Sequence, residues 1–340
     1  MVDINEEFQN LIKQVNKDEV NEFYKLKAIY FERPFILIGI DITTLERRIY
    51  IDITSENWTD DELKSFPKWR GLSITKEYFE KIGPLLDKRF LIIYQEAERS
   101  EEIFEKVLQS LVDRILVDDE KSLYSTIYEV LDRWNSFFRN KPSGKLTLEE
   151  QMGLFGELNY IKNWLEKFPN SEPTIIENWM GPSKNRIDFI KNKIGVEIKT
   201  ISPKLRDDIR ISNEMQLELS DVINKIYLYV LKIEIAQSDG KTIQEMIDDI
   251  RIILLDRSQT NYVRFNEELI KLYVADGEYS DAYFYIHDEL AYLVTEDFPK
   301  VTTHNLPIGI SNVSYVIDLS HCLDFRVDTE EVYDIHREGS

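Results

Sequence analysis

The residues between 147 and 235 follow an order of elements that strongly limits the possible folds. In residues 147–168 the apolar side chains Leu154, Leu158, Ile161 and Leu165 recur at helical spacing, with Thr147 as a candidate N-cap. Short β-type segments follow at 174–179, 186–190 and 195–201, then a segment suited to a helix at 209–221 and an apolar strand at 225–235. The order helix, three strands, helix, strand predicts a mixed α+β core of the α/β class.

The segments on either side predict further elements. Runs of Ile, Phe and Tyr over 23–53 predict strands, and residues 90–94 predict another strand. The spacing of apolar residues in 101–116 and 121–138 predicts two helices. A turn-rich segment, 139–145, follows. We therefore expect an N-terminal α+β domain at 1–145, the core at 146–240, and a C-terminal α/β extension at 241–340 that packs on the core. In the extension we expect helices near 242–256 and 265–274 and strands at 282–286, 290–294 and 313–319.

Charge and composition exclude several classes of protein. The chain has 63 acidic and 42 basic residues and a net charge of −21, which argues against binding nucleic acid through overall positive charge. One cysteine, Cys322, excludes an internal disulfide framework and a cysteine-rich zinc site. The N-terminus lacks a signal-peptide core, and apolar runs such as residues 35–40 are far shorter than the ~20 residues that a membrane span needs. We expect a cytoplasmic protein without a membrane partner.

One segment, residues 181–210, is basic within this acidic chain. It contains eight cations against four acids. The cations are Lys184, Arg186, Lys191, Lys193, Lys199, Lys204, Arg206 and Arg210. Cations around strand carboxylates suit a phosphodiester-cleaving site, because the cations bind the nucleic-acid backbone while the carboxylates bind a metal ion. The alternative is a solvated face of charged residues.

Three side chains of this segment are expected to converge. Glu197 and Lys199 are two residues apart in the strand GVEIKTI, so both point to the same face. Asp188 lies on the preceding strand of a predicted hairpin. Two carboxylates in this arrangement can share a Mg²⁺ ion, which lowers the pKa of a bound water, and Lys199 can orient or deprotonate that water or pair with the phosphate. A surface ion pair is the alternative.

Together, GELNYIKNWLEKFP (156–169), RIDF (186–189) and VEIKT (196–200) resemble the PD-(D/E)xK nuclease superfamily. The resemblance implies a restriction-endonuclease-like core, an endonuclease activity and Mg²⁺, with Mn²⁺ as a substitute. It implies that Asp188, Glu197 and Glu157 are the acids of the active site and its metal ligands, and that Lys199 is the motif lysine. Ile187 stands where the motif has proline.

The resemblance also extends to flanking residues. Gln216, in the helix expected after the motif strand, corresponds to a polar residue that some relatives place beside the phosphate, whereas Ser220 stands where the RecB-like branch has tyrosine. We assign DNA binding to five residues: Lys184, Arg186, Lys204, Arg206 and Gln216. The C-terminal sequence 298–322 and the general layout resemble bacterial PD-(D/E)xK motif proteins encoded beside DNA methyltransferases and ATPases in restriction and phage-defence clusters.

The resulting expectation is a metal-dependent DNA endonuclease of a restriction or anti-phage system. Because the chain is acidic, we expect other protein subunits or a homo-oligomer to contribute DNA affinity. One alternative is a catalytically inactive subunit that uses the same fold for assembly or DNA positioning. A nuclease of RNA or of single strands is a further alternative. The sequence does not distinguish it from a nuclease of duplex DNA, because no residue indicates recognition of the 2′-hydroxyl.

Overall fold

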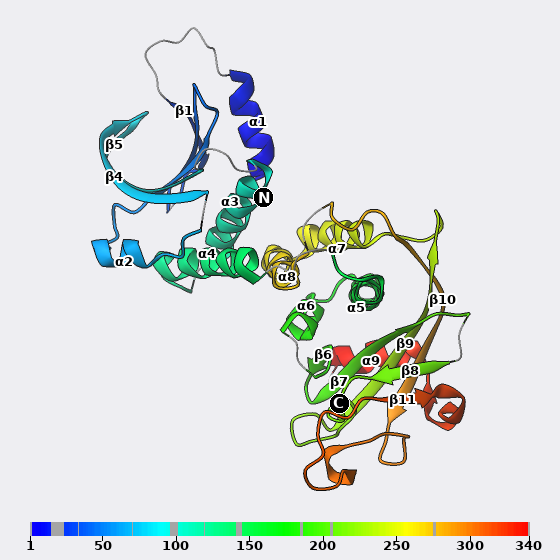
Figure 1. Ribbon diagram of the computed structural model, residues 1–340. Helices are drawn as coiled ribbons and strands as arrows, with labels where there is room; N and C mark the ends of the chain where they lie inside the picture. The colour runs from blue at the N-terminus through cyan, green and yellow to red at the C-terminus, as the bar shows by residue number, and fades with distance from the viewer. Residues whose placement is uncertain are drawn as a thin grey trace. The chain divides into compact units, whose positions relative to one another are not determined.

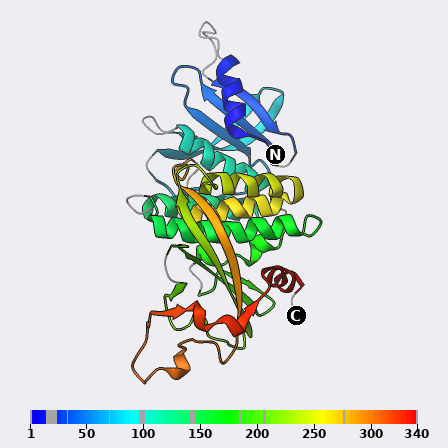
Figure 2. The same ribbon diagram turned by 90° about the vertical axis from the view of Figure 1, so that its right-hand side faces the viewer.

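The computed structural model forms two compact units, Met1–Lys141 and Pro142–Ser340. It describes residues 2–14, 24–32, 34–69, 71–95, 101–118, 120–140, 145–183, 186–204, 207–274 and 277–338. The division between the units falls inside the turn-rich segment 139–145 that the sequence marks. Figures 1 and 2 show a sheet and helices in each unit.

The first unit is an antiparallel sheet with helices, in the strand order β1-β2-β3-β5-β4. The strands are β1 (Tyr24–Tyr30), β2 (Ile36–Asp41), β3 (Arg47–Asp52), β4 (Leu72–Ile82) and β5 (Leu85–Gln95). The helices are α1 (Ile4–Gln14), α2 (Asp60–Ser65), α3 (Glu101–Val117) and α4 (Leu123–Asn140). The predictions of strands within 23–53 and 90–94 and of helices at 101–116 and 121–138 are confirmed.

The second unit is built on a mixed sheet in the order β12-β10-β9-β7-β6. Its strands are β6 (Phe189–Lys191), β7 (Ile194–Ile201), β9 (Lys225–Ala236), β10 (Tyr283–Val294) and β12 (Arg326–Val327). Strands β7 and β9 are parallel, and the other neighbours are antiparallel. A separate ribbon pairs β8 (Asp208–Ile211) with β11 (Tyr315–Asp318). Because β10 pairs with β9 along its length, residues beyond 241 complete the core sheet.

The helices of this unit are α5 (Leu148–Lys167), α6 (Ile175–Asn178), α7 (Ile243–Arg257), α8 (Gln259–Lys271) and α9 (Thr329–Glu338). The predicted N-cap of α5, Thr147, is present and forms part of a capping box: its side chain accepts from the backbone N–H of Glu150, and the Glu150 carboxylate accepts from the backbone N–H of Thr147. The strands expected at 282–286 and 290–294 are one strand, β10, with a register shift between Ile286 and Asp288. No helix within the described residues is long and apolar enough to cross a membrane.

Two local predictions are wrong. The strand expected at 174–179 is instead the short helix α6, whose single turn buries the adjacent Ile175 and Ile176 together. Of the residues predicted as this strand, Trp179 forms an isolated β-bridge, with Phe189. The helix expected at 209–221 is instead β8 followed by turns. Ile209 and Ile211 are buried while Arg210 is exposed, which is the two-residue period of a strand.

Gly156 allows α5 to lie directly against β7. A Cβ atom at this position would lie 2.7 Å from Thr200 Cγ2 and 3.2 Å from Ile198 Cγ2. Any larger residue would therefore push the helix away from the strand. The contact fixes the position of the next residue of α5, Glu157, beside the part of β7 that contains Ile198 and Thr200.

Replacing Gly156 by alanine should test this contact. We expect Gly156→Ala to lower the free energy of unfolding, because overpacking costs about 1–3 kcal/mol and exceeds the gain of about 1 kcal/mol in helix propensity. The matched control is Gly153→Ala in the same helix, where a Cβ would have no atom within 4 Å. The control should gain up to about 1 kcal/mol in urea unfolding. Equal gains in both variants would contradict the close approach.

Candidate active site

The hairpin of β6 and β7 places three of the predicted residues together. Asp188 directly precedes β6, and its Oδ2 accepts a hydrogen bond of 2.7 Å from the backbone N–H of Ile198 in β7. Glu197 and Lys199 lie on the same face of β7, with Lys199 Nζ 2.6 Å from Glu197 Oε1. The pairing of Phe189 with Val196 sets this register. Antiparallel pairing therefore brings the Asp188 carboxylate to the strand that carries the other two side chains.

Glu157 joins them from α5. Its Oε2 accepts a hydrogen bond of 2.5 Å from the indole Nε1–H of Trp179. Gly181 leaves the space for this carboxylate, because a Cβ at that position would lie 2.2 Å from the same oxygen. Trp179 and Gly181 were not among the residues predicted to form the site. The only sequence signal was their position a few residues before Asp188.

Gln216 also reaches the site, although from a turn and not from the expected helix. Its Nε2 donates to Glu197 Oε1 at 2.9 Å, and its Oε1 accepts from the backbone N–H of Ser212 at 2.8 Å. Glu197 Oε1 thus has two partners, Lys199 and Gln216. The other oxygen, Glu197 Oε2, is buried and has no hydrogen-bond partner among the described residues. A buried carboxylate oxygen without a partner is costly, so this atom is suited to a cation.

A cavity of about 270 Å³ connects these groups. Its lining comes from α5, β7, β8 and the turn that follows β8. The lining residues are Glu149, Gly153, Glu157, Asp188, Glu197, Ile198, Lys199, Thr200, Ile201, Ile209, Arg210, Ser212 and Gln216. The cavity therefore contains all four predicted active-site residues and Gln216.

The acids of the cavity repel one another in a buried environment. Burial and the neighbouring charge of Asp188 raise the pKa of Glu197 to about 8. Burial and the same neighbour raise the pKa of Glu157 well above its usual range, and burial also raises that of Asp188. Burial alone would lower the pKa of Lys199, but the charges of Glu197 and Asp188 outweigh it and raise that pKa. Three carboxyl groups thus share one lysine, which leaves the site short of positive charge.

The predicted DNA-binding cations are distributed more widely. Lys184 and Arg206 lie outside the described residues. Arg186 donates to the carbonyl of Met215 (2.9 Å) and to Ser220 Oγ (3.1 Å), so it holds the turn that carries Gln216. Lys204 is exposed and forms an ion pair with Glu234. Arg210 lines the cavity. It is one of the eight cations of the basic segment 181–210, although it is not among the five residues assigned individually to DNA binding.

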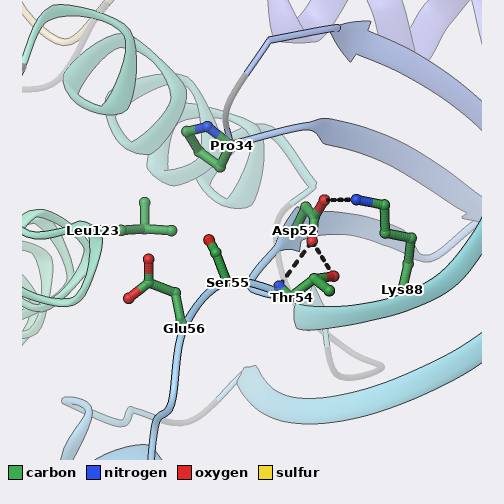
Figure 3. Close-up of a pocket in the computed structure, with 7 residues that line it drawn as sticks. All are labelled: Pro34, Asp52, Thr54, Ser55, Glu56, Lys88 and Leu123. Carbon is green, nitrogen blue, oxygen red and sulfur yellow. Dashed lines mark hydrogen bonds and ion pairs between the residues drawn. The ribbon is translucent and has the colours of Figure 1, made fainter.

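The first unit contains a second hollow, of about 330 Å³ (Figure 3). It is lined by Pro34, Asp52, Thr54, Ser55, Glu56, Lys88 and Leu123. The Asp52 carboxylate is fully engaged, by Lys88 at 2.6 Å and by the backbone and hydroxyl of Thr54. Burial acts to raise the pKa of Asp52, but these contacts outweigh it and lower the pKa. Neither acid of this hollow, Asp52 or Glu56, is among the described residues with a buried, unpartnered carboxylate oxygen, which distinguishes the hollow from the cavity of the second unit.

The structure brings together an acid before one hairpin strand, a Glu-x-Lys on the next and a carboxylate from the preceding helix, which is the arrangement that the resemblance to the PD-(D/E)xK superfamily predicts. Residues 30–320 match the model of a family described as "Putative PD-(D/E)XK family member, (DUF4420)". The chain belongs to this family, which confirms the predicted relationship and its restriction-endonuclease-like α/β fold. Comparisons with curated proteins and with solved structures return no significant match.

Trp179 should stabilise the second unit through Glu157. A double-mutant cycle of Trp179→Phe and Glu157→Ala should give a coupling energy of about 1–3 kcal/mol in urea unfolding, because the indole donor satisfies a buried carboxylate. The matched control pairs Glu157→Ala with Trp164→Phe, another buried tryptophan of the same core. That cycle should be additive within about 0.5 kcal/mol. Additivity in both cycles would contradict a functional Trp179–Glu157 contact.

Asp188→Asn should change the pH dependence of stability. Since burial raises the pKa of Asp188 in the folded state, the wild type loses stability as pH rises through that pKa, and asparagine cannot ionise. The variant should unfold with a free energy higher by on the order of 1 kcal/mol at pH 8, with little difference near pH 4. Urea unfolding across this range measures the effect. A variant that is less stable at pH 8 would show that the carboxylate is favourably paired.

Proposed function

We propose that this protein is a metal-dependent endonuclease that hydrolyses DNA phosphodiester bonds in a restriction or anti-phage system. The observation that carries the proposal is Glu197 Oε2, which is buried and has no hydrogen-bond partner among the described residues. It lies in a cavity whose three buried carboxyl groups have Lys199 as their buried cation, with the exposed Glu149 and Arg210 also in the lining. Such an excess of buried acid is unfavourable for stability, and a bound divalent cation would compensate it. PD-(D/E)xK proteins typically use divalent metal ions, and the donor set here fits one.

Asp188 and Glu197 would hold the metal ion, with Glu157 as the supporting acid. Among the described residues no three His, Cys, Asp or Glu side chains are gathered closely enough to form a complete site. Mg²⁺ is commonly held by one or two carboxylates and several waters, so a two-carboxylate site suits it, with Mn²⁺ as a substitute. When bound, the ion supplies a water of lowered pKa and stabilises negative charge on the phosphate.

Lys199 would act as a cation toward the phosphate. The charges of Glu197 and Asp188 raise its pKa, so the ammonium keeps its proton at neutral pH. A protonated lysine next to the metal ligands can pair with the scissile phosphate and orient the attacking water. Gln216 would hold Glu197 in place, because it donates to the same oxygen as Lys199 does.

DNA is the proposed substrate, bound locally at the basic segment 181–210. Arg210 lines the cavity, and Arg186 and Lys204 belong to the same segment. The net charge of −21 weakens binding by the isolated chain, so we propose that a partner subunit or a second copy contributes affinity. The role in cytoplasmic defence rests on the resemblance of residues 298–322 and the general layout to restriction-cluster proteins.

The direct test is cleavage of supercoiled plasmid and phage DNA with Mg²⁺, Mn²⁺ or EDTA. We expect metal-dependent nicking or linearisation, and a loss of at least about 100-fold in rate for Asp188→Ala and for Lys199→Ala. The matched control is Lys271→Ala, which removes a Lys–Glu ion pair with Glu268 on α8, and it should cleave at the wild-type rate.

Retained cleavage in Lys199→Ala would contradict the proposed role of this lysine. The inactive assembly or DNA-positioning subunit would be favoured by two results together. The wild type cleaves no DNA, either alone or with its genomic neighbours, and the substitutions do not change the activity of the complex.

A further inference from the structure

Residues 301–317 contain no Asp, Glu, Lys or Arg, although 31% of the chain is charged. This segment, VTTHNLPIGISNVSYVI, connects the region after β10 to β11. In a chain of net charge −21, this stretch carries no acid of its own that would repel a polyanion, and the two carboxylates that contact it, Glu214 and Glu218, are hydrogen-bonded to it. The function proposed above does not account for it.

The middle of this segment is an exposed apolar tip, defined here as residues 306–310 (LPIGI). Ile308 is fully exposed and Ile310 is 52% exposed. A turn closed by a hydrogen bond of 3.1 Å from the N–H of Ile310 to the carbonyl of Pro307 shapes the tip. Figures 1 and 2 show this part of the chain, in orange, extending past the end of the core sheet of its own unit. Large apolar side chains presented in this way commonly mark an interaction site.

Two carboxylates fix both sides of the tip to the turn after β8. Glu214 accepts from the backbone N–H groups of Asn312 (3.1 Å) and Val313 (2.8 Å). Glu218 contacts His304 Nδ1 at 2.8 Å and the hydroxyl of Thr303. These contacts hold the tip in a defined position, which lowers the entropy lost when it binds.

The same turn forms a wall of the candidate active site. It carries Gln216, which donates to Glu197 in the cavity. Arg210 lines the cavity and also donates from Nε to Ser314 Oγ at 3.2 Å. Ser314 belongs to the uncharged segment 301–317, called the tip segment below, and lies just after the tip in the chain. In the register of β8 with β11, Arg210 pairs with Val316. The tip segment and the cavity are therefore joined through Arg210 and the turn.

We infer that the apolar tip 306–310 contacts duplex DNA bound at the cavity, as a wedge in the minor groove. This inference rests on the proposed function. Apolar side chains such as Leu, Ile and Pro insert between base steps in this way, while nearby arginines bind the phosphates. DNA is favoured over a protein partner because the tip segment is continuous with the cavity wall, carries no acid and has Arg210 at its base.

The test is duplex binding by the full chain, in the Asp188→Ala background that prevents cleavage, measured by fluorescence anisotropy of a labelled 30-base-pair DNA. Ile308→Ser with Ile310→Ser should lower affinity at least 10-fold and leave the slope of affinity against salt unchanged, because no phosphate contact is lost. Arg210→Ala should reduce that slope by about one. The matched control is Ile252→Ser on α7, an isoleucine that is 69% exposed, and it should bind within twofold of its parent.

The outcomes separate the inference from the proposed function. If the parent binds DNA and the wild type cleaves it, the tip substitutions are compared with each. When they change neither binding in the Asp188→Ala background nor cleavage in the otherwise wild-type chain by more than twofold, the tip inference fails while the nuclease function stands. If the tip variant loses only self-association, seen by light scattering, the tip is a protein contact and the inference also fails. A wild type that neither binds nor cleaves DNA, alone or together with its genomic neighbours, overturns both proposals.

Discussion

The candidate active site of the second unit is organised around an electrostatic imbalance. Three buried carboxyl groups have one buried lysine, Lys199 on β7, to neutralise them. Burial raises the pKa of each of these acids, and among the described residues Lys199 forms its ion pair with Glu197. The hydrogen bonds from Trp179, Gln216 and the backbone of Ile198 offset part of the cost. Functional sites often store unfavourable energy of this kind, which a ligand of opposite charge then relieves.

The surrounding fold keeps the acids close together. The α5 helix can approach β7 because position 156 is glycine, and the β6–β7 hairpin sets the register that presents Asp188 to the backbone of Ile198. The turn after β8 closes the third side, and Arg186 holds that turn through Met215 and Ser220. Arg186, which was predicted to bind DNA, thus also holds part of the fold in place.

Local periodicity explains which parts of the site could be predicted. The two-residue period of a strand placed Glu197 and Lys199 on one face, and the short hairpin brought Asp188 beside them. Gln216 was named from the resemblance, but in the wrong element, because the alternation of Ile209 and Ile211 was interpreted as part of a helix. Trp179, Gly181 and Arg210 were not assigned to the site, since each reaches it through contacts between distant segments.

The sequence by itself determined the order of most elements and the shared face of Glu197 and Lys199, because these depend on periodicity within a few residues. Its resemblance to the PD-(D/E)xK superfamily indicated the family. The tertiary structure decided that β10 completes the core sheet, that the indole of Trp179 satisfies Glu157, and that one oxygen of Glu197 has no hydrogen-bond partner among the described residues. It also decided that the uncharged segment 301–317 is joined to the cavity wall. These features depend on which segments pack together, and packing is set by the whole set of buried side chains.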